Sequence, residues 1–294
     1  MTTRVAAVAS SMLAPVLAAP ARPANVLASF PVATYLDTAG GVVAIVTPDA
    51  VRLPNAVLVK PADYAAIQPG RRGRAEVPTL VGDGTVRVGA VEIGVVRWWN
   101  PVPRLGPVGP VALGEALKRL GDLLPAWPDR RDPALSRLTA GRARLVDALA
   151  GRVAPGEAVS HLVGLGSGLT PAGDDLLAGT LAGLVVLGSA VDAAADPSMG
   201  PTLPSRDPAA LADEIAREAT DRAGSTTRLA ADLTRLAAGG ALAEPAAAVC
   251  RALSGTGPLE SAVARLLRIG HTSGRDLAEG LLVGGQAVTG GYGG

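Results

Sequence analysis

Cysteine and aromatic residues are scarce in this 294-residue chain, which contains one cysteine and only 2% aromatic residues. A single cysteine excludes an intrachain disulfide. Cys250 lies in an apolar helical run with no histidine nearby in sequence, so we expect a small buried residue rather than a nucleophile. The low aromatic content excludes a stacking platform for single-stranded nucleic acid, and the cores must be built from alanine, valine and leucine.

The chain also lacks an excess of charge of one sign. It has 27 Lys and Arg residues and 26 Asp and Glu residues, which gives a formal net charge of +1. This balance excludes a basic stripe for nucleic acid and a polybasic membrane patch. The longest apolar stretch, residues 176–191, is shorter than the roughly 18–20 residues that a membrane span needs. We therefore predict a buried core helix there, and neither nucleic acid nor a membrane as a partner.

The first 24 residues imitate a secretory signal through Arg4, an apolar stretch and the sequence AAPA at residues 18–21. The positively charged part is weak, however, because it rests on Arg4, and Pro15 interrupts the apolar stretch. These features favour an N-terminal helix packed on the first domain of a cytoplasmic protein.

Two regions of different composition follow each other along the chain. Residues 25–100 combine β-branched segments with turn signals, including Gly82-Asp83-Gly84, which is typical of a hairpin. Residues 98–110 contain four prolines and form the junction, and apolar residues then recur at helical spacing from Val111 onward. The sequence predicts an α+β protein with a small β-rich N-terminal domain, barrel or sandwich, at residues 1–110, followed by an all-helical domain at residues 111–294.

The first chemically suggestive segment is GLGSGLTPAGDD at residues 164–175, immediately before a long apolar helix. Glycine permits positive φ and close approach of a ligand, and free amides at a helix start attract anions. The segment is no Walker loop, because no Gly-Lys-Ser/Thr follows, and no dinucleotide fingerprint, because no strand–helix–strand unit surrounds it. We expect a cradle for phosphate or carboxylate.

Asp174 and Asp175 place two acids at this helix start. One of them could cap the helix by accepting backbone N–H bonds. Alternatively, one or both could hold Mg²⁺ together with substrate oxygens, or transfer a proton. Capping explains one aspartate well but the pair less well, so the sequence favours a functional role for at least one.

The segment GHTSGRD at residues 270–276 echoes the first. Asp175, Gly179 and Gly183 are spaced by four, as are Asp276, Gly280 and Gly284, so each helix carries Asp, Gly and Gly on one face. A helical glycine costs about 1 kcal/mol against alanine, and close helix packing is the simplest compensation. If the helices cross on these faces, Asp175 and Asp276 converge on one site.

The histidines and a third cluster complete the candidate groups. His271 has polar loop neighbours and is a candidate for acid–base work or substrate binding, whereas the apolar surroundings of His161 favour a core position. In the segment GSTTRL at residues 224–229, Ser225 or Thr226 is a natural N-cap, which would leave Thr227 and Arg228 to contact an anion.

The predicted site is therefore as follows. The candidate catalytic residues are Asp174, Asp175, His271 and Asp276, with Asp174 and Asp175 also candidate Mg²⁺ ligands. The candidate substrate-binding residues are Gly166, Ser167, Gly168, Thr170, Gly173, Thr226, Thr227, Thr272, Ser273, Gly274 and Arg275.

These motifs together, GLGSGLTPAGDDLLAG, then GSTT before a helix, then IGHTSGRDLAEGLL, resemble a prokaryotic family that includes the AllH subunit of bacterial oxamate carbamoyltransferase. The β-rich part and the Trp99-Asn100-Pro101 junction are also similar, so the resemblance covers most of the chain. It implies work with two other subunits in allantoin breakdown, moving a carbamoyl group between oxalurate and phosphate. Both loops suit those anions, which Arg228 and Arg275 could pair with.

Three functions remain open at this point. The chain could be a carbamoyltransferase subunit or relative, with phosphate or carbamoyl phosphate at the loops. It could be a stand-alone Mg²⁺-dependent phosphoryl-transfer or hydrolytic enzyme that uses Asp174, Asp175 and Asp276 as ligands. It could also be a non-catalytic scaffold subunit, in which the glycines only pack helices.

Overall fold

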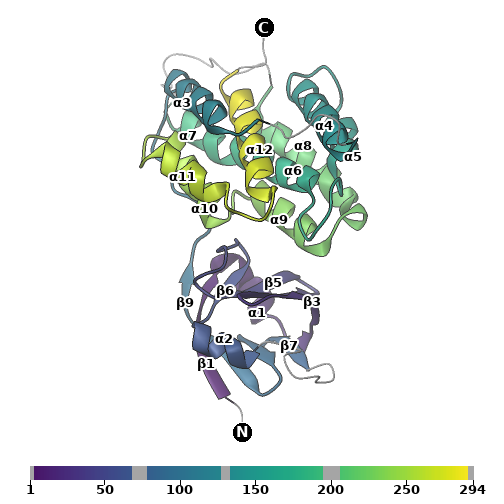
Figure 1. Cartoon of the computed structure of the whole chain (residues 1–294), viewed down its shortest axis with the longest axis vertical. Helices are drawn as coiled ribbons and strands as arrows, with labels where there is room; N and C mark the ends of the chain where they lie inside the picture. Colours follow the sequence, from purple (N-terminus) through teal and green to yellow (C-terminus); the bar gives the residue numbers. More distant parts are fainter. Residues whose placement is uncertain (1–2, 68–77, 127–132, 195–205, 291–294) are drawn as a thin grey trace. The chain divides into compact units, whose positions relative to one another are not determined.

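The computed structural model describes residues 3–67, 78–126, 133–194 and 206–290. The chain divides into two compact units, Met1–Pro101 and Val102–Gly294. Among the described residues, the strands lie in the first unit, and the regular elements of the second unit are helices (Figure 1). The chain is thus an α+β protein, as the sequence predicts.

Unit 1 is a nine-stranded, nearly closed, barrel-like sheet in the order β2-β7-β8-β9-β1-β6-β5-β4-β3. At its middle, β1 (Thr3–Ser10) pairs parallel with β9 (Val91–Trp99) and antiparallel with β6 (Ala56–Leu58). The two end strands, β2 (Arg22–Pro23) and β3 (Asn25–Ser29), are consecutive in the chain, which brings the ends of the sheet together. Of the two predicted architectures, the barrel is the correct one.

The remaining elements of unit 1 are short. They are β4 (Ala33–Thr38), β5 (Gly41–Val46), α2 (Pro61–Ile67), β7 (Thr79–Gly82) and β8 (Thr85–Val88). The predicted hairpin is confirmed between β7 and β8, where Asp83 and Gly84 take φ values of 48° and 78°. Positive φ at both central residues is the geometry of a type I′ turn.

The N-terminal segment differs from the helix that the sequence predicts. Residues Thr3–Ser10 form the central strand β1, in which Val5, Ala7, Ala9 and Ser10 are buried and Ala6 and Val8 are more exposed. Helical structure begins only afterwards, at η1 (Ser11–Leu13) and α1 (Ala14–Ala18). Pairing on both sides with β6 and β9 outweighs the helix propensity of the alanines, because strand preference depends on tertiary packing.

Unit 2 consists of helices whose positions mostly follow the predicted runs. They are α3 (Pro110–Leu123), α4 (Pro133–Leu149), α5 (Pro155–Leu162), α6 (Ala172–Ala182), α7 (Gly188–Asp192), α8 (Pro208–Asp221), α9 (Arg228–Ala238), α10 (Glu244–Leu253), α11 (Leu259–Leu266) and α12 (Ser273–Val288). A π-helical turn, η2 (Gly183–Leu187), joins α6 to α7, and a 3-10 turn, η4 (Ala223–Ser225), precedes α9. Helix α5 was not predicted, because it is only eight residues long.

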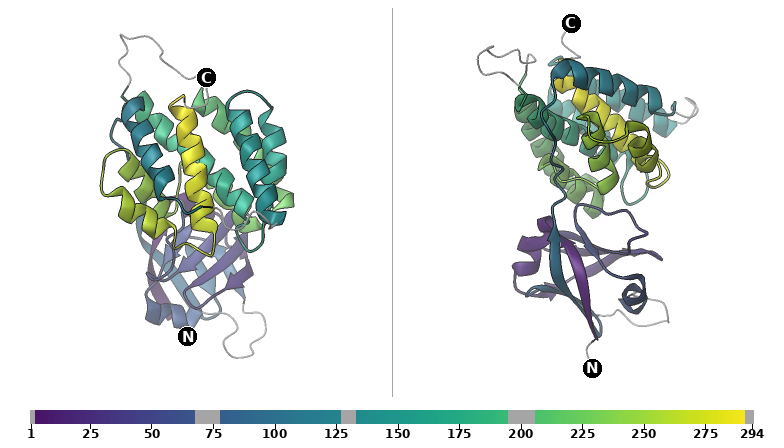
Figure 2. Two further views of the ribbon diagram at one scale, coloured as in Figure 1. Left: turned by 45° about the horizontal axis from the view of Figure 1, so that its top comes forward. Right: turned by 90° about the vertical axis from the view of Figure 1, so that its left-hand side faces the viewer.

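The long apolar helix lies in the core of unit 2, as predicted. Residues Ala172–Asp192 form the one helix among the described residues that is long and apolar enough to cross a membrane. Most of this helix is buried inside the unit. Helix α12 runs alongside α6 through the middle of the unit (Figures 1 and 2). Cys250 is fully buried on α10, and burial raises the pKa of its thiol to about 12, which fits an inert core residue.

Candidate functional site

Helices α6 and α12 cross backbone to backbone at the two predicted glycine stripes. A Cβ atom on Gly179 would lie 2.2 Å from the carbonyl oxygen of Leu277, and one on Gly280 would lie 2.8 Å from the Cα of Gly179. Gly183 and Gly284 meet in the same way, at 2.9 Å from a Cβ of Gly183 to the Cα of Gly284. No side chain fits between these helices, so the prediction that the glycines allow close packing is confirmed.

Each of the loops that precede the two helices has a close glycine contact of its own. A Cβ atom on Gly173 would lie 2.0 Å from the carbonyl oxygen of Leu162, and one on Gly274 would lie 1.9 Å from the carbonyl oxygen of Leu266. Each helix start is therefore folded tightly onto the end of the helix before it, α5 in one case and α11 in the other. The echo seen in the sequence corresponds to a repeated helix–loop–helix unit.

The two loops also contact each other directly. The hydroxyl groups of Thr170 and Ser273 lie 3.0 Å apart and share a hydrogen bond. Both hydroxyl groups also hydrogen-bond the Asp175 carboxyl group. These residues are separated by about a hundred positions in the chain, and the glycine crossing brings them together, so the predicted convergence of the loops is confirmed.

Asp174 is buried, and its carboxyl group bonds residues outside its own helix. Its Oδ2 accepts hydrogen bonds from the Gly164 amide at 2.9 Å and from the Thr226 hydroxyl at 2.8 Å, while the cap residue Pro171 has no side-chain acceptor for the helix. Burial raises the pKa of Asp174, and these two hydrogen bonds offset part of that rise. Asp174 thus ties the start of the first loop to the segment before α9.

The half-buried Asp175 and the buried Asp276 interact electrostatically. Burial is the largest cause that raises the pKa of Asp175 well above its usual value, and the charge of Asp276 raises it further. Burial raises the pKa of Asp276 to about 6. The Oδ2 atom of each residue is buried and has no hydrogen-bond partner among the described residues, so each of these oxygens has an unfilled acceptor position.

The amides at the helix starts are not free, contrary to the expectation from the sequence. Those of Asp174 and Asp175 donate to the carbonyl oxygen of Pro171, and that of Gly173 donates to Leu165. Within the described part of the chain, the amides of the three exposed residues at positions 166–168 donate to no backbone carbonyl group. The amides without a backbone acceptor are therefore on the loop itself rather than in the first turn of α6.

The segment before α9 uses a different cap from the one predicted. Thr227, not Ser225 or Thr226, is the N-cap and accepts from the Ala230 amide at 3.1 Å. The same hydroxyl donates to the Leu169 carbonyl oxygen at 2.5 Å. The hydroxyl group of Thr227 therefore makes both of these hydrogen bonds within the protein. Arg228 is exposed at the first position of α9.

The two histidines lie in different positions. His271 is exposed in the second loop, beside the exposed Thr272. The prediction of a core position for His161 is wrong: the residue is exposed, and its Nδ1 hydrogen-bonds the Glu157 carbonyl oxygen at 2.8 Å. The apolar neighbours that suggested burial, including Val159 and Leu162, lie on the opposite, buried face of the short helix α5.

Arg275 is engaged within the protein. Its Nε donates to the Pro125 carbonyl oxygen at 3.1 Å, and its Nη1 lies 3.9 Å from Asp276 Oδ1. Glu279, one turn further along α12, is 7% exposed and bonds Arg142 of α4 at 2.6 Å. Glu279 is not among the predicted site residues, although a charged residue within a helix of Gly, Leu and Val is a detectable signal.

The described residues do not favour a metal site. No group of three or more His, Cys, Asp or Glu side chains in this part of the chain could hold a metal ion. Asp174 directs its Oδ2 to two hydrogen-bond donors of the protein. The donor set that a Mg²⁺ ion prefers, several oxygens in near-octahedral geometry, is not assembled among these residues.

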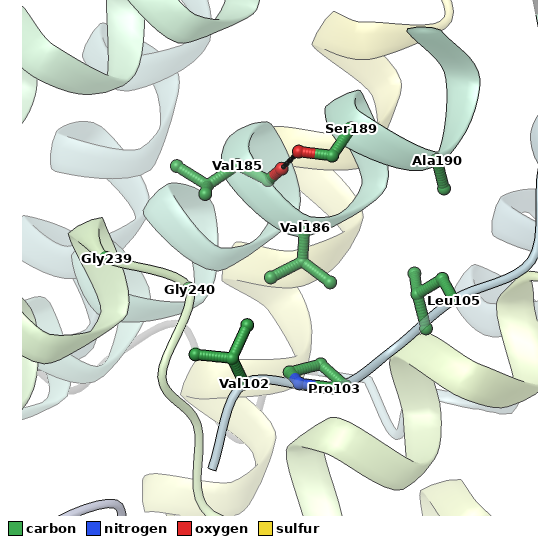
Figure 3. A pocket seen from close by; sticks show the side chains of 9 residues that line it. All are labelled: Val102, Pro103, Leu105, Val185, Val186, Ser189, Ala190, Gly239 and Gly240. Atoms are coloured by element: carbon green, nitrogen blue, oxygen red, sulfur yellow. Dashed lines mark hydrogen bonds between the residues drawn. The ribbon is translucent and has the colours of Figure 1, made fainter. Parts of the chain in front are cut away.

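A cavity of about 140 Å³ in unit 2 is lined by none of the candidate residues (Figure 3). Its lining has no charged residue and consists of Val102, Pro103, Leu105, Val185, Val186, Ser189, Ala190, Gly239 and Gly240. The Ser189 hydroxyl donates to the Val185 carbonyl oxygen at 2.7 Å. With this lining, the cavity does not suit a small anion.

Comparison with known proteins gives a match that covers the region of the glycine-rich motifs. A search of curated proteins and a search of solved structures each give no match. A family model does match, from the end of α5 into α12, and this segment includes both glycine loops and both crossing helices. Residues 162–285 match the model described as oxamate carbamoyltransferase subunit AllH.

Proposed function

We propose that unit 2 binds a small anionic substrate of carbamoyl transfer, of the phosphate, carbamoyl phosphate, oxamate or oxalurate type, at the paired loops 164–170 and 270–273. In this proposal the chain is a subunit, or a relative of a subunit, of an oxamate carbamoyltransferase. The observation that carries it is the joining of the two motif loops beside Asp175 and Asp276, through the Thr170–Ser273 hydrogen bond and the glycine crossing.

The donors of the first loop support an anionic ligand. The amides of Gly166, Ser167 and Gly168 belong to exposed residues, and the positive φ values of Gly166 and Gly168, 122° and 92°, give the loop a backbone that other residues rarely adopt. Successive amides in such a loop form a concave anion receptor. Ser167 is exposed beside them, and its hydroxyl group adds a further donor.

The acids have roles that suit transfer of a carbamoyl group. Burial raises the pKa of Asp175 well above its usual value, which favours the uncharged form of its carboxyl group and lessens repulsion of an approaching anion. Asp276, with a pKa of about 6, is placed to exchange a proton near neutral pH. His271 is exposed in the same loop and is a second candidate for proton transfer.

Calorimetric titration tests this proposal. Phosphate, carbamoyl phosphate and oxamate are titrated, each with and without Mg²⁺, into wild type and into Ser167→Ala, Gly168→Ala and Asp175→Asn variants. We expect binding without Mg²⁺ to wild type and at least tenfold weaker binding to Gly168→Ala, because a Cβ disfavours the φ of this residue, although it meets no other atom within 4 Å. The matched control is Gly114→Ala on α3. Absence of binding of all three anions to wild type would contradict the proposal.

A second candidate, a non-catalytic scaffold subunit, is favoured by one observation. The helix crossing fully accounts for the glycines of α6 and α12, so they require no ligand. The two candidates differ in the partner-dependent reaction. Asp175→Asn abolishes or slows turnover if the acids act on substrate, and leaves turnover unchanged if the unit is only a scaffold.

Partner subunits belong to the same proposal. The name of the matched family describes a subunit of a carbamoyltransferase, and we infer that this chain assembles with other subunits of such an enzyme in the cytoplasm. Co-purification of the tagged chain with the products of adjacent genes tests this inference. A chain that remains alone and shows carbamoyl transfer without partners would contradict it.

A further inference from the structure

The cavity of about 140 Å³ in unit 2 is built from three segments that are far apart in the sequence (Figure 3). The chain that leads into α3 contributes Val102, Pro103 and Leu105, and η2 and α7 contribute a second wall. The turn after α9 closes the third side with Gly239 and Gly240. None of these residues belongs to the two motif loops, so the cavity is a separate feature of the unit.

The side chains around the cavity are aliphatic. Those of Val102, Leu105 and Val186 face a common space, and no charged residue lines it (Figure 3). Val186 is 6% exposed, whereas Val102 and Leu105 are half-buried. The cavity therefore has an apolar floor and an opening to solvent, and a ligand can enter it without unfolding of the unit.

Hydrogen-bond donors along the lining are already engaged within the protein. The Ser189 hydroxyl donates to the Val185 carbonyl oxygen at 2.7 Å, and the amides of Gly239 and Gly240 donate to carbonyl oxygens in the last turn of α9. A buried water needs two to four polar partners, and an ion without a partner has a large desolvation cost. The lining therefore favours a neutral apolar occupant over water or an ion.

The backbone around the cavity is irregular in two places that keep it open. Val185 and Val186 lie on the π-helical turn η2, where consecutive side chains diverge less than on an α-helix, so both valines line the same space. Such turns are rare and occur frequently at functional sites. Gly240 has a φ of 76°, and a Cβ there would contact the Val186 side chain at 3.4 Å. A glycine thus leaves this corner of the cavity free of a side chain.

The volume of the cavity indicates the size of its ligand. An engineered cavity of about 150 Å³ that is lined by Leu, Ile and Phe stays free of water and binds benzene. The cavity in unit 2 has a similar volume and a lining of the same chemistry. We propose that it is a binding site for a small, neutral, apolar molecule of about the size of benzene. The site is independent of the proposed anion site, because it shares no residue with the two loops.

The experiment is a titration of the full chain with benzene at pH 7.5, followed through the NMR signals of ¹³C-labelled valine and leucine methyl groups. In wild type we expect saturable shifts of the methyl signals of Val102, Val185 and Val186. Ala190 also lines the cavity, and leucine at this position adds three carbon atoms to it. Ala190→Leu should therefore bind benzene at least tenfold more weakly, while the control Ala210→Leu, at an exposed residue of α8, should bind it as wild type does.

A matched pair of ligands tests whether the site requires a neutral molecule. Ethylbenzene and benzylammonium have the same shape and differ in a methyl group against a charged ammonium group. We expect ethylbenzene to bind wild type at least tenfold more tightly, because the ammonium group would lose its hydration without gaining a partner.

Three results would overturn the proposal. They are the absence of saturable shifts in wild type, unchanged benzene binding by Ala190→Leu, which would place the benzene elsewhere, and equal affinity for benzylammonium and ethylbenzene. The comparison of ligands uses wild type alone, so the proposal stays testable even if Ala190→Leu does not fold.

Discussion

Asp276 is a carboxyl group whose burial favours its protonated form. Its pKa is about 6 in the folded chain against 3.8 for the free side chain. The folded state therefore binds the proton more tightly than the unfolded state, and the contribution of Asp276 to stability is highest below about pH 4 and falls as the pH rises toward 6. A shift of this size corresponds to about 3 kcal/mol.

Replacing Asp276 by asparagine should remove this pH dependence. We expect Asp276→Asn to be more stable than wild type by about 1–3 kcal/mol at pH 7.5, with a difference that shrinks toward pH 4.5. Urea denaturation of both proteins at the two pH values measures it. A variant that is less stable than wild type at pH 7.5, or a difference that grows toward acid, would contradict the assignment; the control Asp221→Asn, at an exposed residue of α8, should match wild type throughout.

Asp174, unlike Asp276, should stabilise the folded chain, because its Oδ2 accepts two hydrogen bonds. Asp174→Ala leaves the Gly164 amide and the Thr226 hydroxyl without this acceptor, and we expect a loss of about 1–3 kcal/mol. In a double-mutant cycle with Thr226→Val, the coupling energy should be about 1 kcal/mol, measured by chemical denaturation. Ser261→Ala, whose hydroxyl bonds the nearby Pro258 carbonyl oxygen, should give no coupling with Asp174→Ala; coupling of equal size there would refute the contact.

Among the helices, the crossing of α6 with α12 depends on the absence of side-chain atoms. Alanine is the better helix former by about 1 kcal/mol, yet a Cβ on Gly280 would lie 2.2 Å from the Leu176 carbonyl oxygen. The clash is with backbone, so a side-chain rotation cannot relieve it. We expect Gly280→Ala to destabilise the chain by about 1–3 kcal/mol despite the gain in propensity.

Gly114→Ala on α3 is the matched control, because a Cβ there meets nothing within 4 Å. This variant should be more stable than wild type by up to about 1 kcal/mol. Thermal and urea denaturation of the two variants measure both effects. If Gly280→Ala were as stable as Gly114→Ala, the close crossing would not exist in solution.

Element positions could be predicted from the sequence where periodicity extended over several turns. The apolar spacing of α3, α8 and α12 and the Gly-Asp-Gly hairpin indicated the correct elements. The strand β1 could not be predicted, because its alanines carry little strand preference and its place depends on pairing with β6 and β9, which are far along the chain.

The candidate site was predictable to a similar degree. The repeated Asp and Gly spacing pointed to the crossing and to the meeting of Asp175 with Asp276. The partners of individual groups were not predictable: Asp174 bonds Thr226, 52 positions away, and Thr227 rather than its neighbours caps α9. Such contacts follow from how three loops pack together, and local sequence carries no signal for them.

Each unit of the molecule has a hydrophobic core of its own. One large cluster contains residues between Val108 and Val288, and two smaller clusters contain residues between Val5 and Ile93 and between Ala33 and Ala56. A unit with its own core can fold alone. We expect the fragment 102–294 to fold with helical circular dichroism and a cooperative thermal transition, and to bind the same anions as the full chain.

Calorimetry of the fragment and of the full chain tests this expectation. A non-cooperative transition would show that unit 2 needs unit 1 to fold. A folded fragment that has lost anion binding would show that residues of unit 1 contribute to the site, in addition to the two loops. The fragment 1–101 serves as the control and should bind none of the anions.

The glycine crossing has a consequence for how this protein can change. Glycine is the smallest residue, so the four crossing positions have no smaller substitute, and every replacement adds bulk between two rigid backbones. Evolution can therefore alter the side chains that the two loops carry, but cannot adjust the spacing of the two helix starts in small steps. Relatives that accept larger substrates should have altered loops and the same four glycines.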